Sequence, residues 1–162
     1  MLVETLYDRA AAAAYAARWA KSRNPKYYDF GGLGGDCTSF VSQCLYAGCR
    51  VMNYTPVFGW YYINLNNRAP AWTDVRLFYD FLTKNKSAGP YGAAVEKSSL
   101  MTGDVVQLGD QNGRFYHSLF VMRTDGEILV AAHDDDSLMR PLDDYRYFQS
   151  RFLHIIGARK YL

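Results

Sequence analysis

Long apolar runs and clustered basic residues are both absent from this sequence of 162 residues. No window holds the ~18 consecutive apolar residues that a membrane-spanning helix needs, so we expect no membrane span. The net charge is only +2, and the Lys and Arg residues are scattered along the chain. Because proteins that bind nucleic acid usually present a clustered basic surface, nucleic acid is not an expected partner.

Low-complexity segments and internal repeats are missing as well. Hydrophobic residues make up 49% of the chain and charged residues 21%, which is typical of a folded globular protein. The length suits one hydrophobic core, and no linker-like segment interrupts the chain. We therefore expect one domain over residues 1–162.

Cysteine is scarce, because Cys37, Cys44 and Cys49 are the only three in the chain. This odd and clustered set differs from the even and dispersed set of a disulfide framework. The spacing also differs from the C-x-x-C pairs of structural zinc sites, so neither a metal nor another cofactor is expected. At least one of the three thiols should be free.

Helical patterns fill the first half of the chain. We expect helices over residues 4–22, 37–46 and 73–84. The first is rich in alanine, the strongest helix former, the second should have Gly48 as its C-cap, and the third could begin at Thr73 as its N-cap. The stretches between them are expected to be irregular connections, over residues 24–35, 49–72 and 85–99.

From Gly103 onward the pattern changes to short apolar strands separated by turn residues. The runs expected to be strands are DVVQLG, YHSLFVM, EILVAAH and RFLHIIGARKYL. Asp125-Gly126, between the second and third runs, is the strongest short signal for a hairpin turn. Helices followed by a meandering antiparallel sheet predict an α+β fold, with N-terminal helices packed on a C-terminal sheet.

Cys37 follows the glycine-rich stretch GGLGGD and opens the second expected helix. Asp36 is a preferred N-cap, and the dipole and free N–H groups of a helix start can lower a cysteine pKa from about 8.5 to about 3.5–7.5. The same N–H groups could hold the oxyanion of a tetrahedral intermediate. Alternatively, Cys37 is only the first buried residue of an apolar face that continues through Phe40, Val41, Cys44 and Leu45.

A cysteine nucleophile needs a base, and the chain has only three histidines, His117, His133 and His154. A hairpin that turns at Asp125-Gly126 pairs positions whose numbers sum to about 250 or 251. His117 then lies opposite His133 or Asp134, so a base and an orienting group would meet at one end of the sheet. His154 lies mid-strand and is expected to be structural.

Two further clusters have open interpretations. One carboxylate of the acidic run Asp134-Asp135-Asp136 could orient His117, or the three could bind a cation, although most such runs are solvated loops. The aromatic cluster Trp60-Tyr61-Tyr62 could line a groove for a glycan or peptide, with Trp60 as the candidate substrate contact. The same cluster could instead pack a long connection onto the core.

The run YDFGGLGGDCTSFVSQCL, with GDVVQL and HSLFV downstream, resembles the putative amidase domain family of bacteria. The matches continue in order along nearly the whole chain, through YDRAAAAAYA, the WYY and AWTDV segments and AAHDDD. That family is similar to the papain-like superfamily, which includes the CHAP amidohydrolases and the NlpC-type cell-wall peptidases. The resemblance implies a papain-like fold with the catalytic cysteine at a helix N-terminus, packed against an antiparallel sheet.

The resemblance also implies roles for individual residues. Cys37 would be the nucleophile and His117 the general base. The third polar residue would be His133 or, alternatively, Asp134. Tyr28 lies about where related enzymes keep a tyrosine that assists the oxyanion.

We therefore expect a cysteine-dependent amidohydrolase or peptidase. The resemblance implies an amide bond of peptidoglycan as the substrate, as for an autolysin or phage-lysin module that acts at the cell wall. The N-terminus MLVETLYDR lacks the regions of a signal peptide, so we expect a phage-encoded protein, a trimmed form of a longer exported chain, or no export by that route. A non-catalytic papain-like module that binds the wall or a protein, and a transglutaminase-like acyl transferase, stay open as alternatives.

Overall fold

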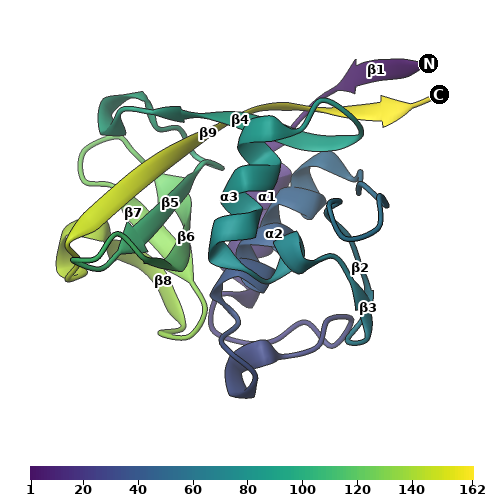
Figure 1. Cartoon of the computed structure of the whole chain (residues 1–162). Helices are drawn as coiled ribbons and strands as arrows, with labels where there is room; N and C mark the ends of the chain where they lie inside the picture. The colour runs from purple at the N-terminus through teal and green to yellow at the C-terminus, as the bar shows by residue number, and fades with distance from the viewer.

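Helices from the first half of the chain pack against strands from the second half in the computed structural model, which describes residues 1–162 (Figure 1). The helices are α1 (Arg9–Trp19), α2 (Cys37–Cys49) and α3 (Val75–Lys84). The large sheet contains β1 (Leu2–Thr5), β4 (Gly89–Val95), β5 (Val105–Gly109), β6 (Phe115–Arg123), β7 (Leu129–Ala132), β8 (Ser137–Pro141) and β9 (Gln149–Tyr161). The remaining elements are the small pair β2 (Tyr62–Asn64) and β3 (Asn67–Arg68) and the short 3-10 turns η1 (Phe30–Gly32), η2 (Pro70–Trp72), η3 (Lys97–Ser99) and η4 (Leu142–Asp144). The predicted α+β class is confirmed.

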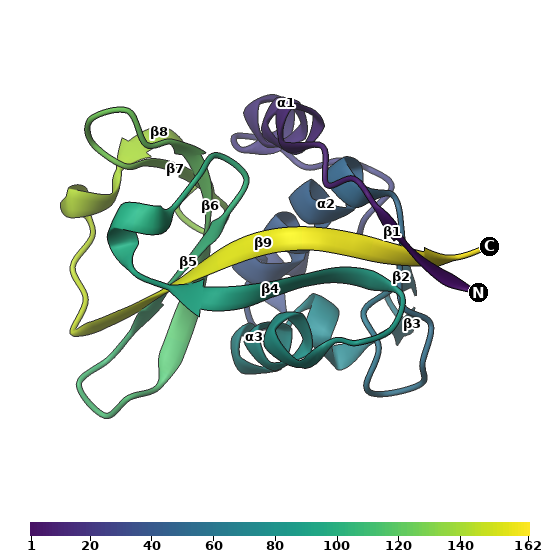
Figure 2. The ribbon, with the colours of Figure 1, turned by 90° about the horizontal axis from the view of Figure 1, so that it is seen from above.

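The large sheet is antiparallel and has the order β1-β9-β5-β6-β7-β8, and β4 pairs with β9 along the edge opposite β1 and β5. Figure 2 shows β9 running from the β5–β8 part of the sheet across to the two chain ends, with β4 beside it and α2 between α1 and α3. The ends meet, because the Leu162 N–H donates to the Met1 carbonyl at 2.9 Å. None of the helices combines the length and the apolar character that crossing a bilayer would require.

The hairpin predicted at Asp125-Gly126 joins β6 to β7. Phe120 pairs with Ala131 and Val121 with Val130, which is the second of the two expected registers. In that register Asp134, and not His133, falls opposite His117. Because β7 ends at Ala132, both candidates lie in the turn that leads to β8.

The N-caps of α1 and α3 are two aspartates that were not predicted, Asp8 and Asp74. Asp8 accepts a hydrogen bond from the Ala11 N–H at 3.0 Å, so α1 begins at Arg9 and is shorter than the predicted 4–22. Asp74 accepts from the Leu77 N–H at 2.9 Å, so the predicted cap Thr73 is wrong. A carboxylate one residue before the helix satisfies a first-turn N–H and complements the helix dipole.

The end of α2 also differs from the prediction, since the helix continues beyond Tyr46 to Cys49. Its C-cap is Arg50, with a left-handed φ of 61° and an N–H that donates to the Tyr46 carbonyl at 2.8 Å. Gly48, the predicted cap, lies inside the helix, where a Cβ would come within 2.8 Å of the Asp8 carbonyl oxygen. Glycine is therefore needed there for the close crossing of α2 and the start of α1.

Five strands were not predicted, and two of them are the small pair β2 and β3 in the predicted connection 49–72. β1 lies where the first helix was expected to begin, β4 lies in the predicted connection 85–99, and β8 follows the acidic run. The sequence of β4, GPYGAAV, has little β-propensity, and its pairing is entirely with the distant β9, from Gly89–Arg159 to Val95–Phe152. Pairing with a distant strand, and not local sequence, makes β1 and β4 strands.

Both faces of the central strands are buried. The larger cluster lies between the sheet and the helices and includes Ala12, Ala16, Phe40, Cys44, Leu45, Trp60, Trp72, Phe78, Val105, Phe120 and Leu153. The smaller cluster covers the other face and consists of Leu100, Val106, Leu108, Leu119, Val121, Val130, Ala132 and Leu142. The alternation of Val105 and Val106 between the two clusters is the period-two pattern of a strand. This packing fixes β6 and α2 against each other.

Candidate active site

Cys37 is the first residue of α2 and is almost completely buried. Its Sγ lies 3.8 Å from Thr38 Oγ1 and 4.0 Å from the carbonyl oxygen of Tyr116 in β6. The Thr38 hydroxyl in turn meets the Ser118 hydroxyl at 2.9 Å. These contacts hold the start of α2 against β6 directly beside His117.

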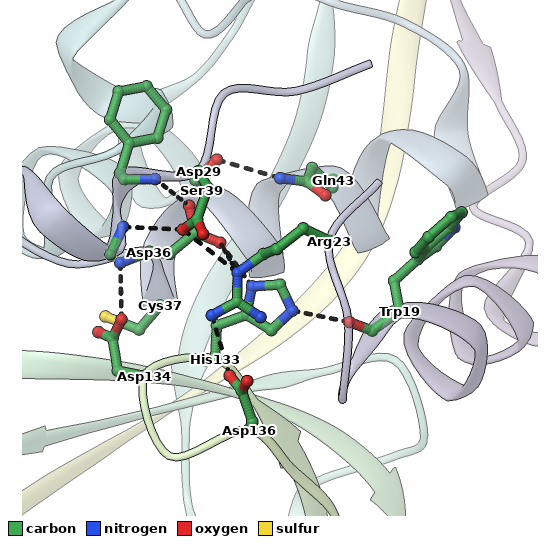
Figure 3. A network of polar contacts seen from close by, with 12 residues as sticks. Trp19, Arg23, Asp29, Asp36, Cys37, Ser39, Gln43, His133, Asp134 and Asp136 are labelled. Atoms are coloured by element: carbon green, nitrogen blue, oxygen red, sulfur yellow. Dashed lines mark hydrogen bonds and ion pairs between the residues drawn. The ribbon is translucent and has the colours of Figure 1, made fainter. Parts of the chain in front are cut away.

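Asp36 holds the loop ahead of α2 without capping the helix. Its side chain makes no hydrogen bond to the helix start. Instead it accepts from the Phe30 N–H at 2.9 Å and meets His133 Nδ1 at 2.5 Å (Figure 3). Arg23 adds a third contact, with Nε 3.6 Å from the same carboxylate. The N–H groups at the start of α2 are thus left without a side-chain cap, which is the arrangement that an oxyanion would use.

His133 is placed away from the role expected for it. Its Nδ1 contacts Asp36, its Nε2 lies 2.7 Å from the Trp19 carbonyl oxygen, and its ring stacks on Phe40 at a centroid distance of 4.0 Å. Both ring nitrogens therefore have partners other than His117, and the ring is buried. His133 ties the end of α1 to the loop before Cys37, so in this structure it is a positioning residue for the helix start.

His117 and Asp134 are brought to Cys37. One atom of each side chain, the Cys37 sulfur, a His117 ring nitrogen and an Asp134 carboxylate oxygen, lies within 4.8 Å of the other two. Asp134 also accepts a hydrogen bond from the Asp36 N–H at 2.8 Å, so the β7–β8 turn is fastened to the loop before α2 (Figure 3). Its backbone has a positive φ of 76°, which is strained for a residue other than glycine.

Asp135 is a second carboxylate close to His117. Its Oδ1 lies 3.9 Å from His117 Nε2. Its Oδ2 accepts hydrogen bonds from Arg140 Nη1 at 2.9 Å, from Ser137 Oγ at 2.9 Å and from the Tyr145 hydroxyl. The sequence pointed to a carboxylate of this run as an orienting group but did not single out Asp135. No sequence pattern pointed to the residues that contact it, which are Ser137 and Arg140 in β8 and Tyr145 after η4.

The pKa values of Cys37 and His117 disfavour a thiolate–imidazolium ion pair before substrate binds. Burial raises the pKa of the Cys37 thiol to about 11, with the Ser118 N–H lowering it and the Asp134 charge raising it. Burial lowers the pKa of His117 below 6.5, although Asp135 and Asp134 pull it upward. The lowered cysteine pKa expected from the helix start is therefore wrong for the resting structure, because desolvation outweighs it. At neutral pH the pair is a thiol and a neutral imidazole.

The two expected substrate contacts, Trp60 and Tyr28, have other neighbours in the structure. Trp60 is fully buried, donates from Nε1 to Ser42 Oγ at 3.0 Å and packs on Trp72 at a centroid distance of 4.7 Å. It is a core residue, so the expectation that it contacts substrate is wrong. Tyr28 is 43% exposed, and its ring packs edge-on against Phe30. No hydrogen bond or ring contact joins Tyr28 to Cys37 or His117.

A metal ion would find its best set of ligands in the same place, since Cys37, His117 and Asp134 each offer one atom. Thiolate, imidazole and carboxylate are all groups that can ligate zinc.

Comparison with known proteins identifies a family for the chain. The family described as "Putative amidase domain" matches residues 6–156, which is nearly the whole chain. The chain is also 36% identical over 140 residues to the uncharacterized protein YhbB of Bacillus subtilis (strain 168), an alignment that covers 83% of this chain and 43% of YhbB. The chain thus spans less than half the length of that relative, and no solved structure matches it. The chain belongs to the putative amidase domain family.

Proposed function

We propose that the protein is a papain-like cysteine amidase that cleaves an amide bond of peptidoglycan. The observation that carries the proposal is the convergence of the Cys37 thiol, the His117 imidazole and the Asp134 carboxylate within 4.8 Å at the start of α2. A nucleophile, a base and uncapped helix N–H groups in one place are the parts that acyl transfer needs. Membership of an amidase family supports amide hydrolysis as the reaction.

In the proposed acylation step, Cys37 Sγ attacks the amide carbonyl carbon while His117 takes the thiol proton. Because the Cys37 pKa is raised to about 11, this proton moves during the attack and not before it. The carbonyl oxygen becomes an oxyanion, which the N–H groups at the start of α2 stabilise. The C–N bond then breaks, and His117 returns the proton to the leaving amine.

Deacylation uses the same groups, with water in place of the amine. His117 removes a proton from water, which attacks the thioester carbon and releases the carboxylic acid and the Cys37 thiol. We assign the orienting role to Asp135, which faces His117 Nε2 at 3.9 Å. Asp134 favours the imidazolium that forms in both steps, because its negative charge lies beside the Cys37 and His117 pair.

Peptidoglycan as substrate is the part of the proposal that rests on the resemblance to cell-wall peptidases. Such a substrate places the activity outside the membrane, at the cell wall. Transfer of the acyl group to an amine would use the same thioester, so only the products separate hydrolysis from transfer.

The test is mass spectrometry of the fragments that the protein releases from purified cell walls. The proposal predicts fragments that carry one new amine and one new carboxylate per cut. New reducing sugar ends would contradict it by indicating a glycosidase, and new amide cross-links would indicate a transferase. Release of no fragment would favour the binding module.

A further inference from the structure

A hollow of about 520 Å³ lies beside the proposed nucleophile. Gly34, three residues before Cys37, lines it, and so does Tyr116, whose carbonyl oxygen lies 4.0 Å from the Cys37 sulfur. Tyr116 also directly precedes His117 in β6. The hollow is therefore positioned to receive the part of a substrate next to the bond that Cys37 attacks.

The walls of the hollow carry three arginines, Arg76, Arg114 and Arg151. None of them lies within ion-pair distance of a carboxylate, whereas the arginine ion pairs of this protein are elsewhere, at Arg9, Arg23, Arg123, Arg140 and Arg159. The wall has one acidic residue, Asp74, whose carboxylate already caps α3. The hollow thus has an excess of positive charge.

Arg151 is held as a rigid anchor. Its guanidinium lies between two aromatic rings, 3.6 Å from the Tyr79 centroid and 3.9 Å from the Phe115 centroid. Nε donates to Gln107 Oε1 at 2.8 Å, but neither terminal nitrogen has a protein acceptor, and Nη2 is buried. A buried donor without a partner is unfavourable, and a fixed guanidinium fork matches the two oxygens of a carboxylate.

A chain of hydrogen bonds joins Arg151 to the nucleophile helix. Gln107, which accepts from Arg151, donates from Nε2 to Ser118 Oγ at 3.1 Å, and Ser118 Oγ meets Thr38 Oγ1 at 2.9 Å. Thr38 follows Cys37 at the start of α2. This buried chain fixes the guanidinium relative to the attacking sulfur, as recognition of a charged group at a set distance from the scissile bond would require.

We propose that this hollow is an anion subsite, in which Arg151 binds a free carboxylate of the substrate close to the amide that Cys37 attacks. The substrate class is thus an acyl or peptidyl amide that bears a carboxylate near the scissile bond. The inference rests on the proposed function, since it uses Cys37 as the reacting group. Arg76 and Arg114 add long-range attraction for the same charge.

The test uses pairs of bromoacetyl reagents that differ only in charge. N-bromoacetyl glycine, β-alanine and γ-aminobutyrate are each compared with their primary amides. In every case the Cys37 sulfur forms a bond to the bromoacetyl carbon, bromide leaves, and the thiol proton passes to His117 or to solvent. Peptide mass spectrometry at about pH 8 gives the labelling rate of Cys37, with the buried Cys44 and Cys49 as internal references.

For at least one spacer, the acid should label wild-type Cys37 about 10-fold faster than its amide. In Arg151→Gln the ratio of the two rates should fall to about 1, and Arg151→Lys should give an intermediate ratio because the charge is kept without the fork. Arg123→Gln, which alters an exposed arginine paired with Asp125, should keep the wild-type ratio. Because both reagents react with the same thiol, a general loss of reactivity in a variant cancels in the ratio.

A ratio of one or less for every spacer in the wild type, or an unchanged ratio in Arg151→Gln, would overturn the subsite. The cell-wall digest is scored separately. If the protein cleaves no amide of the cell wall but reacts faster with the charged reagents, the proposed function is wrong and the subsite stands. If it cleaves cell walls without this charge preference, only the subsite is wrong.

Discussion

At the scale of single residues, Asp134, Asp135 and Asp136 follow one another in the β7–β8 turn, yet each carboxylate has a different partner. Asp134 binds the Asp36 N–H and lies beside Cys37, Asp135 faces His117, and Asp136 pairs with Arg23 at 3.0 Å. The positive φ values of Asp134 and Asp136, 76° and 46°, turn successive side chains in different directions. Local backbone conformation thus gives distinct roles to three identical residues.

Asp135→Asn tests the orienting role. The amide keeps the shape but loses the charge that faces His117, so kcat should fall by about 100-fold as the imidazole loses its fixed orientation. Hydrolysis rates on purified cell walls measure this effect. Asp143→Asn, at an aspartate with a 78% exposed side chain that pairs with Lys97, should keep the wild-type rate, and an equal loss in both variants would contradict a specific role for Asp135.

The pH profile of the wild type follows from the two shifted pKa values. Burial lowers the pKa of His117, so the imidazole stays neutral and able to accept a proton until the pH falls below about 6.5. Activity should therefore hold through neutral pH and fall only on the acid side, as the pH drops through the His117 pKa. Because the Cys37 pKa is raised to about 11, thiol ionisation should add no step near neutrality.

Asp135→Asn should shift the acid limb of this activity profile to lower pH. The Asp135 charge raises the His117 pKa, so its removal lets burial lower that pKa more. Initial rates across the pH range measure the limb in both proteins. An acid limb that moves to higher pH would contradict the assignment of His117 as the group that must be neutral.

Among the elements, the proposed catalytic arrangement depends on how closely the loop before α2 meets the β7–β8 turn. Gly35 has a φ of +108°, and a Cβ there would come within 2.9 Å of Asp134 Oδ2. A side chain at this position would push Asp134 away from Cys37. The glycine-rich sequence before Asp36 thus serves both a left-handed turn and a close approach.

Gly35→Ala should lower wall hydrolysis by about 100-fold, because it displaces the turn that carries Asp134 and Asp135. Gly126→Ala is the matched control, since Gly126 also has a positive φ, +119°, but its Cβ would meet nothing within 4 Å. Both variants should lose about 1–3 kcal/mol of unfolding free energy from backbone strain. Similar activity in the two would contradict the proposed coupling of loop and turn.

The elements show how far the sequence could predict this fold. The α2 start and the β6–β7 hairpin depend on local signals, a cysteine after Asp36 and a turn at Asp125-Gly126, and these were predicted, with the register left between two possibilities. β1 and β4 have no such signal, because both depend on pairing with the distant β9. Trp60 was misassigned because an aromatic cluster looks the same in sequence whether it is buried or exposed.

The site shows the same division. Cys37 and His117 were predicted from their positions at element starts, and the two possible hairpin registers gave His133 or Asp134 as the third residue; the structure brings Cys37, His117 and Asp134 together. In the structure His133 contacts Asp36 and the Trp19 carbonyl and not His117, and no sequence pattern connects these partners to β7. Asp135 could be singled out only from the backbone conformation of its turn, and a sequence of three adjacent aspartates does not specify that conformation.

At the scale of the whole molecule, a buried aspartate joins the helices to the sheet. Asp104 is fully buried, pairs with Arg9 of α1 at 2.8 Å and accepts from the Ile155 N–H of β9 at 2.9 Å. His154, expected to be structural, contacts the same carboxylate at 2.9 Å. α1, β5 and β9 are thus held by one carboxylate far along the chain from Cys37.

Asp104→Ala should destabilise the protein by about 3–5 kcal/mol, because it leaves Arg9 and the Ile155 N–H without their partner. Urea unfolding followed by circular dichroism measures this loss. Asp125→Ala, at an 83% exposed aspartate paired with Arg123, should change the unfolding free energy by less than about 1 kcal/mol. Equal effects would contradict a central role for Asp104.

The rate of wall hydrolysis by Cys37→Ala is the sharpest test of Cys37 as the nucleophile. Cys49→Ala, which removes a buried thiol at the far end of the same helix, is the matched control. Cys37→Ala should lose at least about 10⁴-fold in rate, while Cys49→Ala should keep most of it. Undiminished hydrolysis by Cys37→Ala would show that another group attacks the amide.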